Sequence, residues 1–107
     1  MTTVFFTTIT DEDSGNEDTF INQTLEGALR TVLETLFDEW TIEVSNPEAV
    51  KEKIREAFAK PDRSLYDGRR SSVSMHIDIP QFDETGRMYP SPQLGCKFTT
   101  IERTLGE

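Results

Sequence analysis

The chain has 107 residues, of which 35% are hydrophobic and 29% are charged, and its formal net charge is -9. This composition predicts a single folded domain over residues 1–107 and excludes a disordered chain or one with a membrane-spanning run of about 20 apolar residues. A single cysteine, Cys96, excludes an internal disulfide and favours a reducing compartment, so we expect a cytoplasmic protein without a secretory signal.

The net charge comes from one part of the chain. Up to Glu43 there are ten acidic residues and one basic residue, Arg30, whereas the rest of the chain has ten of each. Acidity that is concentrated in one segment produces a negative surface field, which an even distribution would not.

The first 43 residues predict a strand, a loop and a helix. Residues 2–10 are rich in threonine and aromatic side chains, which favour a strand, and the acidic, Gly-containing stretch 11–18 favours a loop. A helix over residues 23–39 follows, with Asn22 or Thr24 as its N-cap, because apolar side chains recur at spacings of three and one. These side chains are Leu25, Ala28, Leu29, Val32, Leu33, Leu36, Phe37 and Trp40.

The middle of the chain predicts a second helix. Residues 41–44 form a short extended segment, and Ser45 with Glu48 has the spacing of a capping box. The helix then buries side chains four residues apart, such as Ile54 and Phe58, and ends at Lys60, before a proline.

The last third predicts two strands. Residues 62–70 read as a loop, and residues 71–79 alternate between apolar and polar side chains, as in a strand with one buried face. Residues 80–95 form a long connection with a short ordered piece at 87–89. Residues 96–105 form the final strand, with a bulge at Thr99 and Thr100 where the alternation slips.

Together these elements predict an α+β fold in the order β-α-(β)-α-β-β. Two amphipathic helices would pack on one face of a small, mostly antiparallel sheet of three or four strands.

Residue types that could perform catalysis or bind metal do not have the required spacing. Ser74, His76 and Asp78 have the identities of a catalytic triad, but positions two apart on a strand stand roughly 7 Å apart, so we expect a solvated strand face. The acidic stretch from Asp11 lacks the glycine and the glutamate of a calcium loop at the required positions. Cys96 has no motif around it and is expected to be buried. We therefore predict no enzyme activity, no metal site and no cofactor.

The acidic segment carries the functional hypothesis. It predicts a small non-catalytic inhibitor or adaptor that binds a basic protein or nucleoprotein complex by mimicking nucleic acid, as phage- or plasmid-encoded anti-CRISPR and anti-restriction proteins do. Direct binding of nucleic acid is disfavoured by the net charge, and no membrane partner is expected. The predicted partner-binding residues are Asp11, Glu12, Asp13, Glu17, Asp18, Glu26, Glu34, Asp38 and Glu39. The alternative is a structural or assembly subunit, such as a homodimer formed through the strand at 2–10 or the edge at 96–105, whose acidity serves only solubility.

Overall fold

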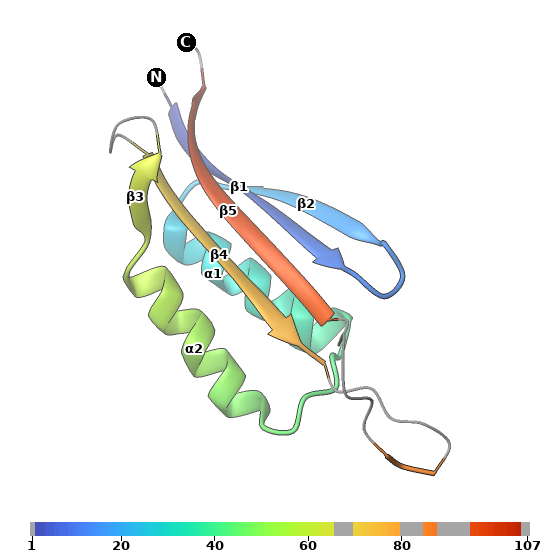
Figure 1. Cartoon of the computed structure of the whole chain (residues 1–107). Helices are drawn as coiled ribbons and strands as arrows, with labels where there is room; N and C mark the ends of the chain where they lie inside the picture. The colour runs from blue at the N-terminus through green and yellow to red at the C-terminus, as the bar shows by residue number, and fades with distance from the viewer. Residues whose placement is uncertain (1, 66–69, 80–84, 88–94, 106–107) are drawn as a thin grey trace.

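A single antiparallel sheet organises the molecule (Figure 1). The computed structural model describes residues 2–65, 70–79, 85–87 and 95–105. The five strands are β1 (Thr2–Asp11), β2 (Glu17–Asn22), β3 (Asp62–Leu65), β4 (Arg70–Asp78) and β5 (Gly95–Leu105). The helices are α1 (Leu25–Leu33), its continuation η1 (Glu34–Glu39) and α2 (Pro47–Ala59). The predicted α+β class with a mainly antiparallel sheet and two helices is therefore confirmed.

The strand order is β2-β1-β5-β4-β3, and every neighbouring pair is antiparallel. The last strand in the sequence thus lies at the centre of the sheet, and its end pairs with the start of β1, so the two termini lie side by side (Figure 1). β1 pairs with β2 over residues 5–10 and β5 pairs with β4 over residues 95–101, so both strands proposed for a homodimer have a strand neighbour on each side over most of their length.

The predicted number and order of strands were wrong in three places. Residues 17–22 form β2, although 11–18 were predicted to be loop and 19–21 were assigned to no element. Residues 62–65, which were predicted to be loop, form β3, whereas residues 41–44 form no strand. In β2, Thr19 to Ile21 have high β propensity, but this segment is short and follows acidic residues that resemble a loop. β3 is a short edge strand with charged residues and therefore has no apolar pattern. The order is therefore β-β-α-α-β-β-β.

The first helix begins at one of the two predicted caps. The Thr24 hydroxyl accepts a hydrogen bond from the Gly27 N–H at 2.9 Å, while the side chain of Asn22 accepts one from the Thr31 hydroxyl at 3.2 Å. From Glu34 the helix widens to π geometry, in which the Trp40 N–H donates to the Thr35 carbonyl at 2.8 Å. The predicted end near residue 39 is confirmed.

The second helix is capped one residue later than predicted. The Asn46 side chain accepts a hydrogen bond from the Ala49 N–H at 3.1 Å, and Pro47 occupies the first turn. On the outer face Glu48 pairs with Lys51 at 3.4 Å and Glu52 pairs with Arg55 at 3.5 Å. The predicted capping box from Ser45 to Glu48 is therefore wrong, but the predicted helix is confirmed.

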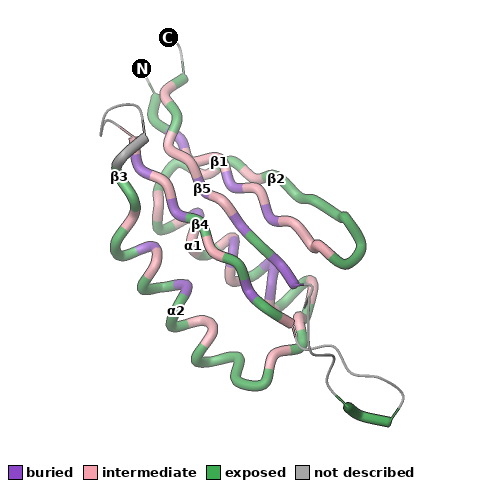
Figure 2. The backbone as a smooth tube through the Cα atoms, viewed as in Figure 1, coloured by how far each residue is buried: buried purple, intermediate pink, exposed green. Residues whose placement is uncertain are grey.

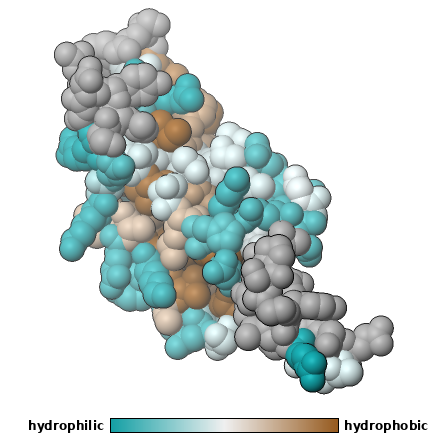
Figure 3. All heavy atoms as spheres, viewed as in Figure 1, coloured by the Kyte–Doolittle hydropathy of each residue, from teal (hydrophilic) through white to brown (hydrophobic). Residues whose placement is uncertain are grey.

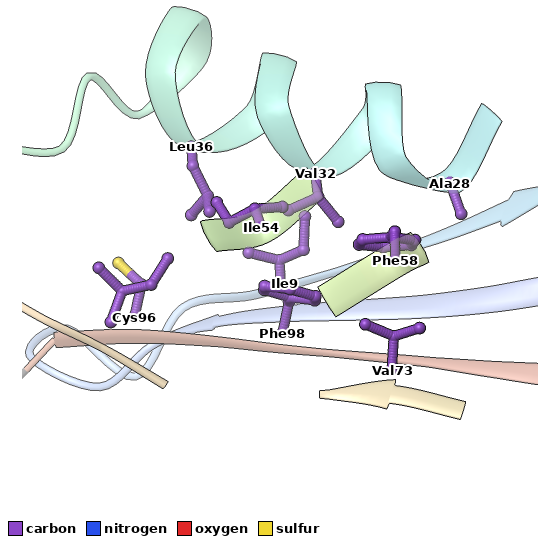
Figure 4. Close-up of a cluster of buried hydrophobic side chains, with 10 residues drawn as sticks. Ile9, Ala28, Val32, Leu36, Ile54, Phe58, Val73, Cys96 and Phe98 are labelled. Carbon is purple, nitrogen blue, oxygen red and sulfur yellow. The ribbon is translucent and has the colours of Figure 1, made fainter. Parts of the chain in front are cut away.

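Both helices pack against the sheet in one core (Figure 4). The Phe58 ring on α2 stacks on the Phe98 ring of β5, with 5.6 Å between the ring centroids. The buried side chains of this core are Ile9, Ala28, Val32, Leu36, Ile54, Phe58, Val73, Ile77, Cys96 and Phe98. Figure 2 shows these buried positions on the inner strands and helices, whereas the β1–β2 hairpin is mostly exposed toward its tip.

A pair of buried hydroxyls explains why the bulge predicted in β5 is wrong. Thr100 is buried and shares a hydrogen bond of 2.8 Å with the buried Thr7 hydroxyl. A threonine thus occupies an inward-facing position, which makes the hydrophobic alternation look as if it slips. β5 pairs with β1 and β4 through Thr99 and Thr100 without a register shift.

None of the helices in the described residues has both the length and the hydrophobicity of a membrane-spanning segment.

Candidate functional site

The acidic stretch between β1 and β2 begins with an ordered turn. The Asp11 carboxylate accepts hydrogen bonds from the Asp13 N–H and the Ser14 hydroxyl, both at 3.0 Å. The Asp11 N–H donates to the Asn16 carbonyl at 2.8 Å, and Gly15 supplies the left-handed backbone (φ 78°) that the turn requires. The acidic side chains of the hairpin are therefore carried on a defined backbone.

The end of η1 lies beside this turn. After Trp40 the chain reverses through Thr41, whose φ of 46° is unusual for a β-branched residue, and the Ile42 N–H donates to the Leu36 carbonyl at 3.0 Å. A pocket of about 240 Å³ lies between the helix end and the hairpin. It is lined by Asp11, Asp13, Trp40, Thr41, Ile42, Glu43, Ile79, Gly95 and Cys96.

Asp11, Asp13 and Glu43 line this pocket, Glu12 stands between Asp11 and Asp13 in the sequence, and Asp38 and Glu39 directly precede the pocket residue Trp40. We call these six residues the acidic end. Glu17 and Asp18 follow on the same hairpin, where they pair with Thr10 and Ile9 of β1, and Glu34 lies one turn before Asp38. Figure 3, which views the sheet side of the molecule, shows hydrophilic and intermediate residues over this hairpin.

Glu26 is the exception among the predicted partner-binding residues. It lies twelve residues before Asp38 on the same helix, a distance of about 18 Å at about 1.5 Å per residue. It lines a different pocket, between the helices, together with Arg55. The sequence prediction had omitted Glu43 and Trp40, whose proximity to Asp11 depends on the packing of the helix end against the hairpin.

Among the described residues, the basic residues of α2 form no ion pair with the acidic residues of η1. Lys51 and Arg55 pair with glutamates of their own helix, and the Lys51 ammonium also lies 5.0 Å from the centre of the Phe37 ring. Within the described residues, Glu34, Asp38 and Glu39 form no ion pair with a lysine or an arginine. All three are exposed. Their charge is therefore presented to solvent.

These three carboxylates oppose the stability of the helix that carries them. A negative charge in the last turn interacts unfavourably with the helix dipole, at a cost of about 0.3–1 kcal/mol, which affects Asp38 and Glu39. Glu34 and Asp38 also repel each other across one turn, because residues four apart are neighbours on the helix surface. Helix stability therefore does not explain the presence of these residues.

The pKa of the Cys96 thiol is raised by burial and by nearby negative charges. The thiol is 1% exposed, as predicted, and burial, followed by the charges of Asp11 and Glu12, raises its pKa to about 11. The thiol is therefore protonated near neutral pH and is not a nucleophile.

The candidate triad residues are exposed on β4, as predicted, but the structure adds a contact. The His76 Nδ1 lies 3.0 Å from the Asp78 carboxylate, and its Nε2 contacts the carboxylate of Glu12 from the hairpin. Both ring nitrogens face carboxylates, so the ring has no nitrogen left to activate Ser74. No group of histidine, cysteine or acidic side chains in the described residues is arranged to hold a metal ion.

No protein-family model, no curated protein and no solved structure gives a significant match to this chain.

Proposed function

We propose that this chain is a small non-catalytic inhibitor or adaptor that uses its acidic end to bind a basic, nucleic-acid-handling protein. Nucleic-acid mimicry of this kind is the strategy of phage- and plasmid-encoded anti-CRISPR and anti-restriction proteins. One observation carries the proposal: Glu34, Asp38 and Glu39 are exposed, have no basic partner among the described residues, and lie where they weaken their own helix. Residues that cost stability are often retained for function.

The spacing of the carboxylates supports mimicry of a phosphate backbone. Glu34 and Asp38 are one helical turn apart, which is at most about 6 Å along the axis at the α-helical rise of about 1.5 Å per residue and lies between one and two steps of about 3.4 Å between phosphates of one strand. Asp11 and Asp13 continue the negative surface across the pocket. A groove that binds nucleic acid would thus meet a comparable series of negative charges.

The pocket beside Trp40 suits a cationic side chain of such a partner. Carboxylates of Asp11, Asp13 and Glu43 surround it, and the indole contributes an aromatic surface. A guanidinium group prefers this combination, because it forms charge-assisted hydrogen bonds with carboxylates and stacks on aromatic rings.

Capture from a lysate of the source cell tests the proposal. The test variant combines Glu34→Lys, Asp38→Lys and Glu39→Lys; the matched control makes the same charge change on α2, at Glu48, Glu52 and Glu56, which are also exposed. The native chain and the control are expected to capture the same basic protein. This capture should weaken at high salt and on addition of duplex nucleic acid, because screening and competition act on the same contacts.

The η1 variant should lose this capture. Equal capture by the η1 variant and the native chain, or capture that duplex nucleic acid does not displace, would refute the proposal.

A further inference from the structure

β2 is an edge strand of the sheet, and its outer side pairs with no strand in the part of the chain that the structure describes (Figure 1). Edge strands commonly carry a lysine, a proline or a bulge, which prevent pairing with another chain. β3, at the opposite edge, begins with the charged residues Asp62 and Arg63, and its register with β4 shifts. β2 has two acids at its start and then an uncharged run, Thr19 to Asn22, in regular register. Its outer backbone groups are therefore open to a further strand.

A row of apolar side chains on the open face of the sheet ends at this edge. Ile21 of β2 pairs with Phe6 of β1, which pairs with Ile101 of β5. Phe6 and Ile101 stand three positions from the core residues Ile9 and Phe98 on their strands, so they lie on the face opposite the helices. Phe6 and Ile101 are half-buried, whereas Ile21 is 59% exposed. A strand added beside β2 would cover this exposed end of the row.

The charges of β2 favour a second copy of the chain in antiparallel orientation. Glu17 and Asp18 lie at one end of the strand and Asn22 lies at the other. In an antiparallel pair centred on Phe20, each Asp18 lies opposite the partner's Asn22, and the two Phe20 side chains face each other. Parallel pairing in register would instead place each acid beside the same acid of the partner, which is destabilising.

The start of α1 provides a second element that complements these acids. α1 begins three residues after Asn22, and Asp18 shares the helix side of the sheet with its register partner Ile9, a core residue. In the pair centred on Phe20, Asp18 therefore approaches the N-terminus of the partner's α1. The helix dipole favours a negative charge at this end. The two-fold symmetry of the pair repeats the contact, so both copies gain from it.

We propose that β2 pairs with β2 of a second copy, antiparallel about Phe20, and joins two five-stranded sheets into one continuous sheet. The pairing strand has six residues, so the interface is smaller than those of stable dimers, which bury at least about 1,200 Å². The association is therefore weak and depends on concentration. This inference goes beyond the proposed function and does not depend on it.

Analytical ultracentrifugation tests the pairing, at a salt concentration of about 0.15 M that screens the net charge of -9. The native chain should show a monomer–dimer equilibrium. Ile21→Glu should raise the Kd about tenfold above that of Ile21→Lys, because the new charge lies diagonal to the partner's Glu17 and the contact occurs twice. Both variants lose the isoleucine, so their difference isolates the charge.

Leu105→Glu is the control for these variants, because Leu105 is also an exposed hydrophobic side chain but lies on β5, away from the edge. It should leave the Kd of the native chain unchanged. A native chain that stays monomeric at about 1 mM would overturn the inference. Equal Kd values for the two Ile21 variants, or a weakening by Leu105→Glu, would overturn it as well.

Disulfide cross-linking with oxidised glutathione tests the register. Phe20→Cys should form a disulfide between copies, because directly opposite residues have Cα atoms about 4.5–5.5 Å apart, within the range that a disulfide spans. Thr19→Cys is the control, because the two copies of residue 19 are diagonal and too far apart for this bond. The native Cys96 is buried and does not compete. Equal cross-linking of the two variants would exclude a pair centred on Phe20.

Discussion

The two helices bury comparable inner faces but carry their charges in opposite ways. On α2, glutamates pair with a lysine and an arginine three residues later, so its outer face is nearly self-neutralised. On η1 the exposed charges are all negative, have no basic partner among the described residues, and lie at the helix end that disfavours them. The charges of α2 are explained by the helix itself. Those of η1 are not explained by the helix that carries them.

The largest expected effect is the loss of unfolding free energy when a buried side chain is truncated on the inner face of either helix. Leu36→Ala in η1 and Ile54→Ala in α2 each remove a fully buried side chain from the same core. Each should lower the free energy of unfolding by about 2–5 kcal/mol, because burial is lost and a cavity remains. Chemical denaturation measures both. A large loss for only one of them would show that the helices do not share one core.

The two helix ends provide a second comparison. Thr41 follows η1 with a φ of 46°, which a β-branched residue adopts at a cost, whereas Lys60 at the end of α2 has a φ of -130°. Thr41→Gly should therefore raise the free energy of unfolding by up to about 1 kcal/mol, despite loss of the hydroxyl bond to the Trp40 carbonyl. Lys60→Gly should bring no gain. Equal effects in thermal unfolding would contradict this explanation.

The charges themselves should act with opposite signs on stability. Asp38→Lys with Glu39→Lys should stabilise the fold by about 0.3 kcal/mol for each exposed charge, because lysine is favoured at a helix C-terminus. Glu48→Lys with Glu52→Lys should destabilise it by about 0.2–0.5 kcal/mol for each ion pair removed. Denaturation at low salt measures both variants. The contrast between the helices fails if the two changes have the same sign.

The smallest effect is on Cys96, which lies beside the acidic end. Asp11→Asn and Glu12→Gln should each lower the pKa of the thiol from about 11, because a negative neighbour is removed. Burial, the larger cause, remains, so the thiol should stay protonated near neutral pH. Thiolate absorbance as a function of pH measures this shift. Glu48→Gln, on α2, should leave the titration unchanged, and an equal shift there would exclude a local field.

The amino-acid sequence alone determined the elements whose signal is local. The apolar spacing of the first helix, the spacing of Ile54 and Phe58, and the alternation around Val73 all arise within one segment, because one buried face imposes a period on its own side chains. The sequence also showed that the net charge belongs to the first 43 residues. Polar strands such as β2 were missed, because backbone pairing with β1 rather than apolar periodicity stabilises them.

Only the tertiary structure decided which distant residues meet. The placement of β5 between β1 and β4 brings Glu12 to His76, and the turn after Trp40 brings Glu43 to Asp11. The same packing separates Glu26 from the acidic end. Such contacts depend on how whole elements dock through a shared core, and no period or spacing within one segment contains that information.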